Sequence, residues 1–211
     1  MNLEDLRNTH EGETIWVLGS GPTLGFIDSR FFENKVVVST NFSAQVAGID
    51  NPYVFTHYHQ DAAKLAGESR AVVTLKKNTQ PNTPWPGELP ENVILIQQDS
   101  YRPPGANWDP FTHNPPQSDS LVYGSSSFHG AMHLGAWLGA KFLVLVGADC
   151  GTLDGQHRID GYPNGDKQWV LYSGHHKLMK DWLIDKYGVG VYSLNPFLNL
   201  NLEGHKFQGV A

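Results

Sequence analysis

The sequence predicts an α/β fold built on a single doubly wound, mostly parallel sheet of the Rossmann-like kind. Short apolar runs recur along the chain, and each is bounded by Gly, Pro, Asn or Asp. Such runs are typical of strands that are buried on both faces of a parallel sheet. Stretches with helical spacing lie between the later runs, and alternating strands and helices predict this layered architecture. A glycine-rich turn directly follows the first run.

Seven runs are expected to form the strands, because they are short, apolar and rich in β-branched or aromatic residues. They are Thr14–Leu18, Lys35–Thr40, Tyr53–Thr56, Ala71–Leu75, Val93–Ile96, Phe142–Val146 and Val189–Leu194. Two longer stretches are expected to be helices. Ser127–Gly139 is small, apolar and free of proline, and His175–Tyr187 has its large apolar residues at helical spacing.

A proline-rich segment, 76–120, interrupts this rhythm. Nine of the 13 prolines lie between Pro81 and Pro116, and proline disfavours helix because it lacks an N–H group. Long loops in compact domains are often lids or binding loops. One interpretation makes the segment a wall of an acceptor site, and the other makes it a plain surface loop. The first is based on four aromatic residues: Trp85, Tyr101, Trp108 and Phe111.

Composition excludes several classes of protein. The chain has 211 residues, which suits one domain spanning 1–211, and a net charge of −6 with no Lys/Arg run longer than two. Nucleic acid is therefore not an expected partner. The single cysteine, Cys150, excludes an internal disulfide, and no apolar run is long enough to cross a membrane. The polar start of the chain is unlike a signal peptide, so a cytoplasmic location is expected.

The turn after the first strand predicts a nucleotide crevice at the carboxyl ends of the strands. Its residues are Gly19, Ser20, Gly21, Pro22 and Thr23. Glycines there allow a tight turn and bring N–H groups close to a phosphate. The dinucleotide fingerprint is absent because Leu24 replaces its last glycine, and Asn41 rather than an acidic residue follows the second strand. Nucleotide binding is favoured over a plain strand-to-helix turn, and NAD is disfavoured.

Polar residues also begin the first predicted helix and end the strand 142–146. Ser126 and Ser127 either cap the helix or hold an anionic ligand at its N-terminus. Asp149 lies where ligands of open α/β sheets collect, and capping of a turn is the competing interpretation. The polar stretch 151–173 suits a flap. Cys150 is interpreted as a packed thiol.

Histidines provide candidates for proton transfer and for metal binding. His175 and His176 are expected to open the last helix, where a helix N-terminus would lower the pKa of the ring and favour a neutral base. A solvated histidine pair is the alternative. His57 with His59, and His129 with His133, could chelate a metal, but the latter pair lacks the glutamate of H-E-x-x-H. No metal or cofactor is expected.

Taken in order, these motifs resemble the bacterial lipooligosaccharide sialyltransferases, which use CMP-activated sialic acid. The family's first turn reads G-N-G-P-S-L, and its second strand ends in Asn, as at Asn41. A T-S-G turn opens its small-residue helix, matched by Ser126–Ser127. Its next strand ends in G-I-D, matched by Gly147–Asp149, and its last helix opens with G-H-S, matched by Gly174–His176. Ser20 replaces the family's Asn in the first turn.

The same frame resembles the 6-hydroxymethylpterin diphosphokinase-like family, which uses ATP with magnesium. That family's G-x-D-L…D-G…H…G pattern is matched by Gly147, Asp149, Asp154–Gly155, His157 and Gly161. Under this alternative, Asp149 and Asp154 would hold magnesium for diphosphoryl transfer to a hydroxymethyl group. A non-catalytic nucleotide-binding protein is a third possibility.

The first resemblance implies glycosyl transfer from a CMP-sialic acid-like donor to an acceptor hydroxyl, without a metal ion. The turn residues 19–23 would hold the donor phosphate, while Asn41 and Ser127 would hold ribose and base. Tyr162 and Tyr172 correspond approximately to flap tyrosines that contact phosphate, and would neutralise the charge on the departing phosphate. His175 would act as the general base. The related families also favour homo-oligomers.

Overall fold

The structure is a computed structural model that describes residues 1–76, 87–98, 120–122, 126–150, 156–162 and 169–194. Within these residues the strands form one eight-stranded sheet in the order β6-β5-β4-β3-β2-β1-β7-β8. Every pair of neighbouring strands is parallel. The predicted fold class is therefore confirmed, and the sheet of this part of the chain is wholly parallel.

The strands are β1 (Thr14–Leu18), β2 (Val36–Thr40), β3 (Tyr53–Thr56), β4 (Ala71–Leu75), β5 (Val93–Gln98), β6 (Ser120–Leu121), β7 (Phe142–Val146) and β8 (Gly190–Ser193). The helices are α1 (Ser43–Val46), α2 (His59–Ala66), α3 (Ser127–Trp137) and α4 (Trp169–Tyr187). Short 3₁₀ helices are η1 (Leu3–Leu6), η2 (Pro22–Phe26) and η3 (Ser29–Phe32).

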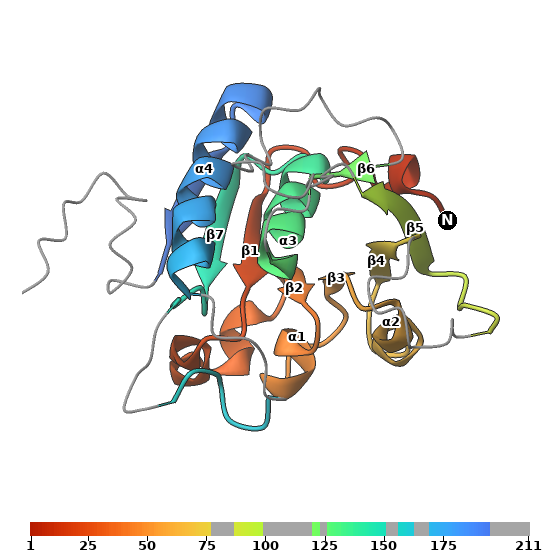
Figure 1. Cartoon of the computed structure of the whole chain (residues 1–211), viewed down its shortest axis with the longest axis horizontal. Coiled ribbons are helices and arrows are strands. Elements are labelled where there is room, and N and C mark those ends of the chain that lie inside the picture. The colour runs from red at the N-terminus through yellow and green to blue at the C-terminus, as the bar shows by residue number, and fades with distance from the viewer. Residues whose placement is uncertain (77–86, 99–119, 123–125, 151–155, 163–168, 195–211) are drawn as a thin grey trace, which may run out of the picture.

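The strand order reverses at β1, which makes the ends of β1 and β7 the topological switch point of the sheet. Strands β2 to β6 extend from one side of β1, while β7 and β8 extend from the other. The connections that leave β1 and β7 therefore diverge at their carboxyl ends. This switch point is where ligands of open α/β sheets bind. In Figure 1 the arrowheads of β1 and β7 point toward the short helices drawn below the sheet.

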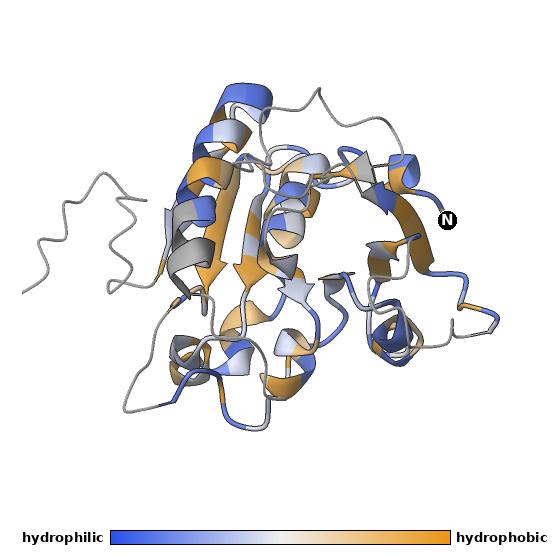
Figure 2. Ribbon diagram, viewed as in Figure 1, coloured by the Kyte–Doolittle hydropathy of each residue, from blue (hydrophilic) through white to orange (hydrophobic). Residues whose placement is uncertain are grey.

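Alternate side chains of the strands pack on opposite faces of the sheet. Ile15 and Val17 belong to a buried cluster that also contains residues of α3 and α4. Leu18 and the half-buried Trp16 belong to a second cluster, with residues of η2, η3 and α1. A third cluster joins α2 to β3 and β4. Figure 2 shows the resulting apolar colouring of the strands, which are covered on both faces as parallel sheets require.

Helix α3 is buried on all sides and is held close to the sheet by glycines. All of its residues are buried. A Cβ atom on Gly130 would lie 2.3 Å from the ring of Phe55 in β3, and one on Gly135 would lie 2.7 Å from Leu143 in β7. Only glycine permits this approach. The mostly small and apolar sequence of 127–137 agrees with this environment, because a helix that is hydrophobic on most sides is a buried one.

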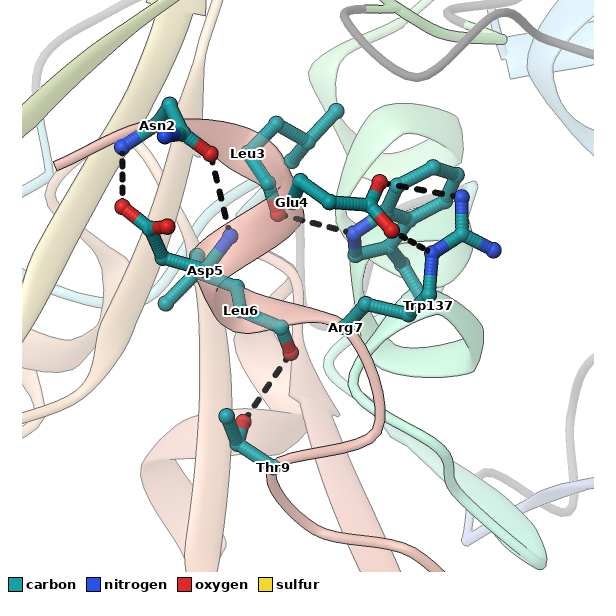
Figure 3. A network of polar contacts seen from close by, with 8 residues as sticks. All are labelled: Asn2, Leu3, Glu4, Asp5, Leu6, Arg7, Thr9 and Trp137. Carbon is teal, nitrogen blue, oxygen red and sulfur yellow. Dashed lines mark hydrogen bonds and ion pairs between the residues drawn. The ribbon is translucent and has the colours of Figure 1, made fainter.

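The N-terminal segment covers the far end of α3. The indole N–H of Trp137 donates to the carbonyl of Leu3 at 2.9 Å, and the guanidinium of Arg7 lies 4.0 Å from the centre of the Trp137 ring. Arg7 is also paired with Glu4 (Figure 3). The backbone N–H groups of Asn8, His10 and Gly12 donate to carbonyls at the end of α3. The amino end of the sheet is thus closed, and the carboxyl end carries the polar residues.

Most predicted elements are confirmed, with one important correction at α4. The seven predicted strands match β1 to β5, β7 and β8, and the helix 127–139 matches α3. Helix α4, however, begins at Trp169 and not near His175, so the end of the proposed flap 151–173 is helical. Helices α1 and α2 and strand β6 were not predicted. None of the helices in the described ranges combines the length and the apolarity that crossing a bilayer would need.

The close approach of α3 leads to a prediction about stability. We expect Gly130→Ala to lower the free energy of unfolding by about 1–3 kcal/mol, as overpacked cores do, although alanine is the better helix former. The physical reason is the contact with the buried Phe55 ring. Urea unfolding followed by circular dichroism would measure the change.

Gly67→Ala is the matched control, because the nearest atom to its added Cβ would be Lys64 O at 3.8 Å and its backbone is already helical. We expect this variant to be as stable as the parent or slightly more stable. Equal losses in the two variants would show that α3 has room at Gly130.

Candidate functional site at the carboxyl ends of the strands

The glycine turn after β1 is tied to the end of β7 by its own backbone. Gly19 N–H donates to Val146 O at 2.7 Å, and Gly21 N–H donates to Gly147 O at 2.8 Å. A Cβ atom on Gly19 would lie 2.4 Å from Gly147 O, and one on Gly21 would lie 2.4 Å from Asp149 Oδ2. The glycines are therefore required for the two chain segments to pass each other.

These bonds change the expected role of the turn. The sequence predicted that glycine N–H groups would hold a phosphate, but the N–H groups of Gly19 and Gly21 are already donated within the protein. Thr23 N–H is also used, by Asp149 at 2.8 Å. Ser20 is the residue of this turn whose N–H has no acceptor among the described residues. A Gly21→Val variant would clash with Asp149 and so would not test phosphate binding.

Asp149 lies at the predicted edge and connects β7 to η2. Its carboxylate accepts both the N–H and the hydroxyl of Thr23, which stands in the first turn of η2. This arrangement agrees with the interpretation that Asp149 caps a turn. Asp154, its expected partner in a magnesium site, lies outside the described residues. Among the residues that are described, no three His, Cys, Asp or Glu side chains are grouped as a metal site would need.

Asn41 follows β2 and links two neighbouring segments. Its Oδ1 accepts the hydroxyl of Thr56 at 2.8 Å, at the end of β3. Its Nδ2 donates to Tyr162 Oη at 3.2 Å. Asn41 has a φ of 45°, a left-handed backbone that asparagine adopts more readily than most residues. Asn41 thus lies at the carboxyl edge of the sheet, as its position after β2 predicted, while its contact with a nucleotide stays a prediction.

The segment 156–162 lies over the glycine turn. Ile159 N–H donates to Ser20 O at 2.9 Å, and Arg158 Nη1 donates to Ser20 Oγ. The guanidinium carbon of Arg158 lies 5.4 Å from the centre of the Tyr162 ring. This segment thus connects the end of β1 to the end of β2. The neighbouring residues 151–155 and 163–168 of the proposed flap, and the side chain of Tyr172, lie outside what the structure describes.

The two serines at the start of α3 have different partners. Ser126 is the N-cap, and its Oγ accepts the N–H of Phe128 at 3.2 Å. Ser127 Oγ lies 2.6 Å from Nδ1 of His57, just after β3. Burial lowers the pKa of His57 to about 4, so its ring is neutral at pH 7. Ser127 is therefore not used for capping, and it joins a histidine at the same edge as Asn41.

His176 is a buried structural residue. Its Nδ1 lies 2.6 Å from His129 Nε2, and its Nε2 lies 3.4 Å from Cys150 Sγ. His129 Nδ1 accepts the N–H of Ser126, so the proton of His129 is on Nε2 and is donated to His176. Burial, and then the neighbouring His175, lower the pKa of His176 to about 3. The ring is a neutral link between α4, α3 and the end of β7.

The location of His175 differs from the expectation. Because α4 begins at Trp169, His175 lies in the second turn of the helix and not at its N-terminus. The expected lowering of its pKa by the helix dipole does not apply there, since that effect is confined to the first turn. His175 as a whole is 8% exposed, and its ring centre lies 6.0 Å from that of His129. Figure 1 shows α4 beginning beside the carboxyl end of β7.

His129 and His133, which share one face of α3, use their ring nitrogens for hydrogen bonds within the protein. His133 Nδ1 accepts Val122 N–H at 2.8 Å, and its Nε2 lies 2.7 Å from Tyr187 Oη, whereas His129 bonds to His176. The pKa of His133 is lowered to about 3 by burial. The environment of Cys150 agrees with the interpretation of a packed thiol. Burial, and then the charge of Asp149, raise the pKa of the Cys150 thiol to about 12.

Two residues of the candidate site, His57 and Arg158, were not predicted from the sequence to belong to it. His57 was considered only as a metal ligand, although its position directly after a strand placed it at the carboxyl edge. Arg158 was overlooked inside the polar stretch that follows Asp149. The available signal was the position of Arg158, a positively charged residue in the glycine-rich stretch that follows the central strand 142–146.

The fold is similar to those of two glycosyltransferase structures. The sialyltransferase CstII from Campylobacter jejuni, in complex with a substrate analogue, cytidine-5'-monophosphate, superimposes with a TM-score of 0.53, 13% identity and coverage of 91% of this chain and 84% of that one. The MAf glycosyltransferase from Magnetospirillum magneticum gives a TM-score of 0.52 at 14% identity, and covers 90% of this chain but only 35% of its own length.

No protein-family profile matches the sequence, and no curated protein matches it either. At these identities the structural likeness concerns the arrangement of strands and helices. The chain therefore has a sialyltransferase-like, Rossmann-type α/β fold.

Proposed function

We propose that the protein is a glycosyltransferase that moves a sugar from a nucleotide-activated donor, resembling CMP-sialic acid, to an acceptor hydroxyl. The observation that supports this most is that two polar pairs, Asn41 with Tyr162 and Ser127 with His57, lie at the carboxyl ends of β2 and β3 in a sialyltransferase-like fold. A solved structure with that fold is a sialyltransferase in complex with a substrate analogue, cytidine-5'-monophosphate. A nucleotide-activated donor is therefore the ligand class to test first.

In this proposal the nucleotide lies across the ends of β1, β2 and β3. Asn41 and Ser127 contact its ribose and base. Asp149 is close enough to the turn to contact the nucleotide, but its carboxylate mainly holds Thr23 in place. The polar stretch between β7 and α4 covers the donor and excludes water. Tyr172, which belongs to α4, is assigned a phosphate contact on the resemblance alone.

Tyr162 has the geometry to stabilise the leaving group. Its Oη accepts the amide of Asn41, so its own proton is directed to another acceptor. During transfer the bond between the sugar and the phosphate oxygen breaks, and its electron pair remains on the phosphate. A phenol that donates to this oxygen stabilises the growing negative charge. The acceptor oxygen forms the new bond to the sugar, and its proton passes to His175.

Metal-independent nucleotide binding is the first expected outcome. We expect CMP to raise the melting temperature in the presence of EDTA, because a ligand at 100 times its Kd stabilises the native state by about 2.7 kcal/mol. For a chain of this size that corresponds to a shift of roughly 5–10 °C. ATP with magnesium should produce a smaller shift, and differential scanning fluorimetry would measure both.

A larger shift with ATP and magnesium, lost on adding EDTA, would favour the diphosphokinase alternative with Asp149 as a metal ligand. Binding of CMP without turnover of any activated sugar would favour a non-catalytic nucleotide-binding protein.

The adjacent histidines provide a second prediction, in which each variant is the control for the other. We expect His175→Ala to reduce turnover of the sugar donor by about 10²–10⁴-fold, the usual contribution of a general base, without changing the affinity for CMP. His176→Ala should instead lower stability, because it removes a buried hydrogen bond between His129 and His176. Transfer kinetics, CMP titration and thermal melting of both variants provide the three measurements.

If His176→Ala loses turnover at unchanged stability while His175→Ala keeps its turnover, then His176 is the general base and His175 is not. If turnover is unaffected in both variants, another group accepts the proton.

A further inference from the structure

The donors available at the glycine turn are concentrated on one residue. Within 19–24 the N–H groups other than that of Ser20 are donated inside the protein, and Pro22 has none. Among the described residues no acceptor takes the Ser20 N–H, and Ser20 also retains its hydroxyl proton. The residue as a whole is only 7% exposed, so these donors are largely withdrawn from bulk water. Buried donors are normally satisfied, and an exception at a functional edge indicates a ligand.

Arg158 determines which way the Ser20 hydroxyl can act. Arg158 Nη1 donates to Ser20 Oγ, so the oxygen is the acceptor in this pair. The hydroxyl proton must then be directed to a different acceptor. A hydroxyl that accepts a bond from a charged group is polarised and becomes a better donor. Ser20 and Arg158 together therefore present donors and positive charge to one anionic group.

The charge of Arg158 is needed because an acidic side chain lies beside the turn. A Cβ on Gly21 would be 2.4 Å from Asp149 Oδ2, so a phosphate approaching this turn also approaches a carboxylate. Thr23 donates two hydrogen bonds to that carboxylate, which holds it in place without removing its charge. Arg158 offsets this charge locally. Its guanidinium and the Asp149 carboxylate act in opposite directions on the pKa of the neighbouring Cys150.

Contacts on both sides hold Arg158 in position. The next residue, Ile159, donates its N–H to Ser20 O at 2.9 Å. On the other side the guanidinium lies over the ring of Tyr162, whose hydroxyl is bonded to Asn41. An arginine fixed in this way loses little further conformational freedom when it binds an anion.

We propose that Arg158 and Ser20 form the phosphate subsite of the donor, with Arg158 as a further catalytic residue. This assignment rests on the proposed function for the identity of the donor, but the chemistry of the subsite requires only a phosphate group. In the transfer reaction the donor phosphate diester becomes a monoester and gains negative charge. Arg158, placed at that group before the bond breaks, stabilises the product-like transition state more than the ground state.

The test compares a nucleotide with its nucleoside. We expect Arg158→Gln to weaken CMP binding by about 10- to 100-fold, the loss of a charge-assisted contact to phosphate, and to leave cytidine binding unchanged. Ser20→Ala should weaken CMP in the same direction but by a smaller factor. Isothermal titration of both ligands to each variant provides the comparison. Unchanged CMP affinity in Arg158→Gln, or an equal loss for cytidine, would overturn the assignment.

Arg70→Gln is the matched control. Arg70 also places its guanidinium 5.4 Å from the centre of a tyrosine ring, that of Tyr53, but it precedes β4 at the opposite end of the strands. The Arg70→Gln variant loses the same charge and the same kind of ring contact as Arg158→Gln. We expect its affinity for CMP to equal that of the parent. A loss as large as that of Arg158→Gln would show a general effect of net charge and overturn the subsite.

Failure of the proposed function has a different signature. If the parent protein binds neither CMP nor cytidine, the donor is wrong, and the subsite is then tested with inorganic phosphate alone. Phosphate should raise the melting temperature of the parent above that in chloride at equal ionic strength, and the rise should be absent in Arg158→Gln. Equal shifts in both proteins, or none in the parent, would overturn the subsite independently of the donor.

Discussion

The contact between the turn after β1 and the end of β7 is the constraint on which the rest of the site depends. Two segments that leave adjacent parallel strands in different directions pass within hydrogen-bonding distance, and Gly19 and Gly21 have no room for a side chain. This contact fixes the position of Ser20, and through Asp149 it fixes the start of η2. The glycines are therefore explained by packing, and the chemistry of the turn is left to the side chains around it.

Histidines contribute to this organisation mainly as neutral hydrogen-bonding groups in the interior. His133 and His176 are buried, and the pKa of each is lowered to about 3. Each ring bonds through both of its nitrogens and so links elements that are distant in sequence. His176 joins α4 to His129 in α3 and to Cys150. His133 joins Val122, which follows β6, to Tyr187 at the end of α4. A histidine-rich sequence that suggested metal or proton chemistry is thus used largely for structure.

The fold was predictable from the sequence because its signal is local. Val36, Val37 and Val38, for example, belong to a run that is apolar on both faces, and only a buried strand accommodates such a run. The start of α4 was not predictable from Gly174, which suggested a helix boundary there but lies inside the helix. Helix α2 was missed because its apolar face is supplied by two alanines and one leucine among polar residues.

The site was predictable only as a set of strand ends. Asn41, Asp149 and Ser127 could be placed at one edge from topology, because the carboxyl ends of parallel strands share that edge. Their partners could not, since Thr23, His57 and Tyr162 meet them across long stretches of chain. The acceptors of the N–H groups in the glycine turn could not be predicted either. No feature of the glycine motif indicated that carbonyls at the end of β7 would accept them.

The turn after β1 donates the N–H groups of Gly19 and Gly21 to the end of β7, so these groups are not available to bind an anion. Where backbone N–H groups hold a phosphate, recognition is fixed by the turn itself. Here those of Gly19 and Gly21 are donated to the end of β7, and the proposed phosphate subsite uses the side chains of Ser20 and Arg158 instead. Within the segment 156–162, Ile159 packs against the second core cluster, whereas the Arg158 side chain contacts Ser20 and the Tyr162 ring. Under the proposed subsite, a change at Arg158 would therefore alter the recognition of an anion with less effect on the core than a change at Ile159.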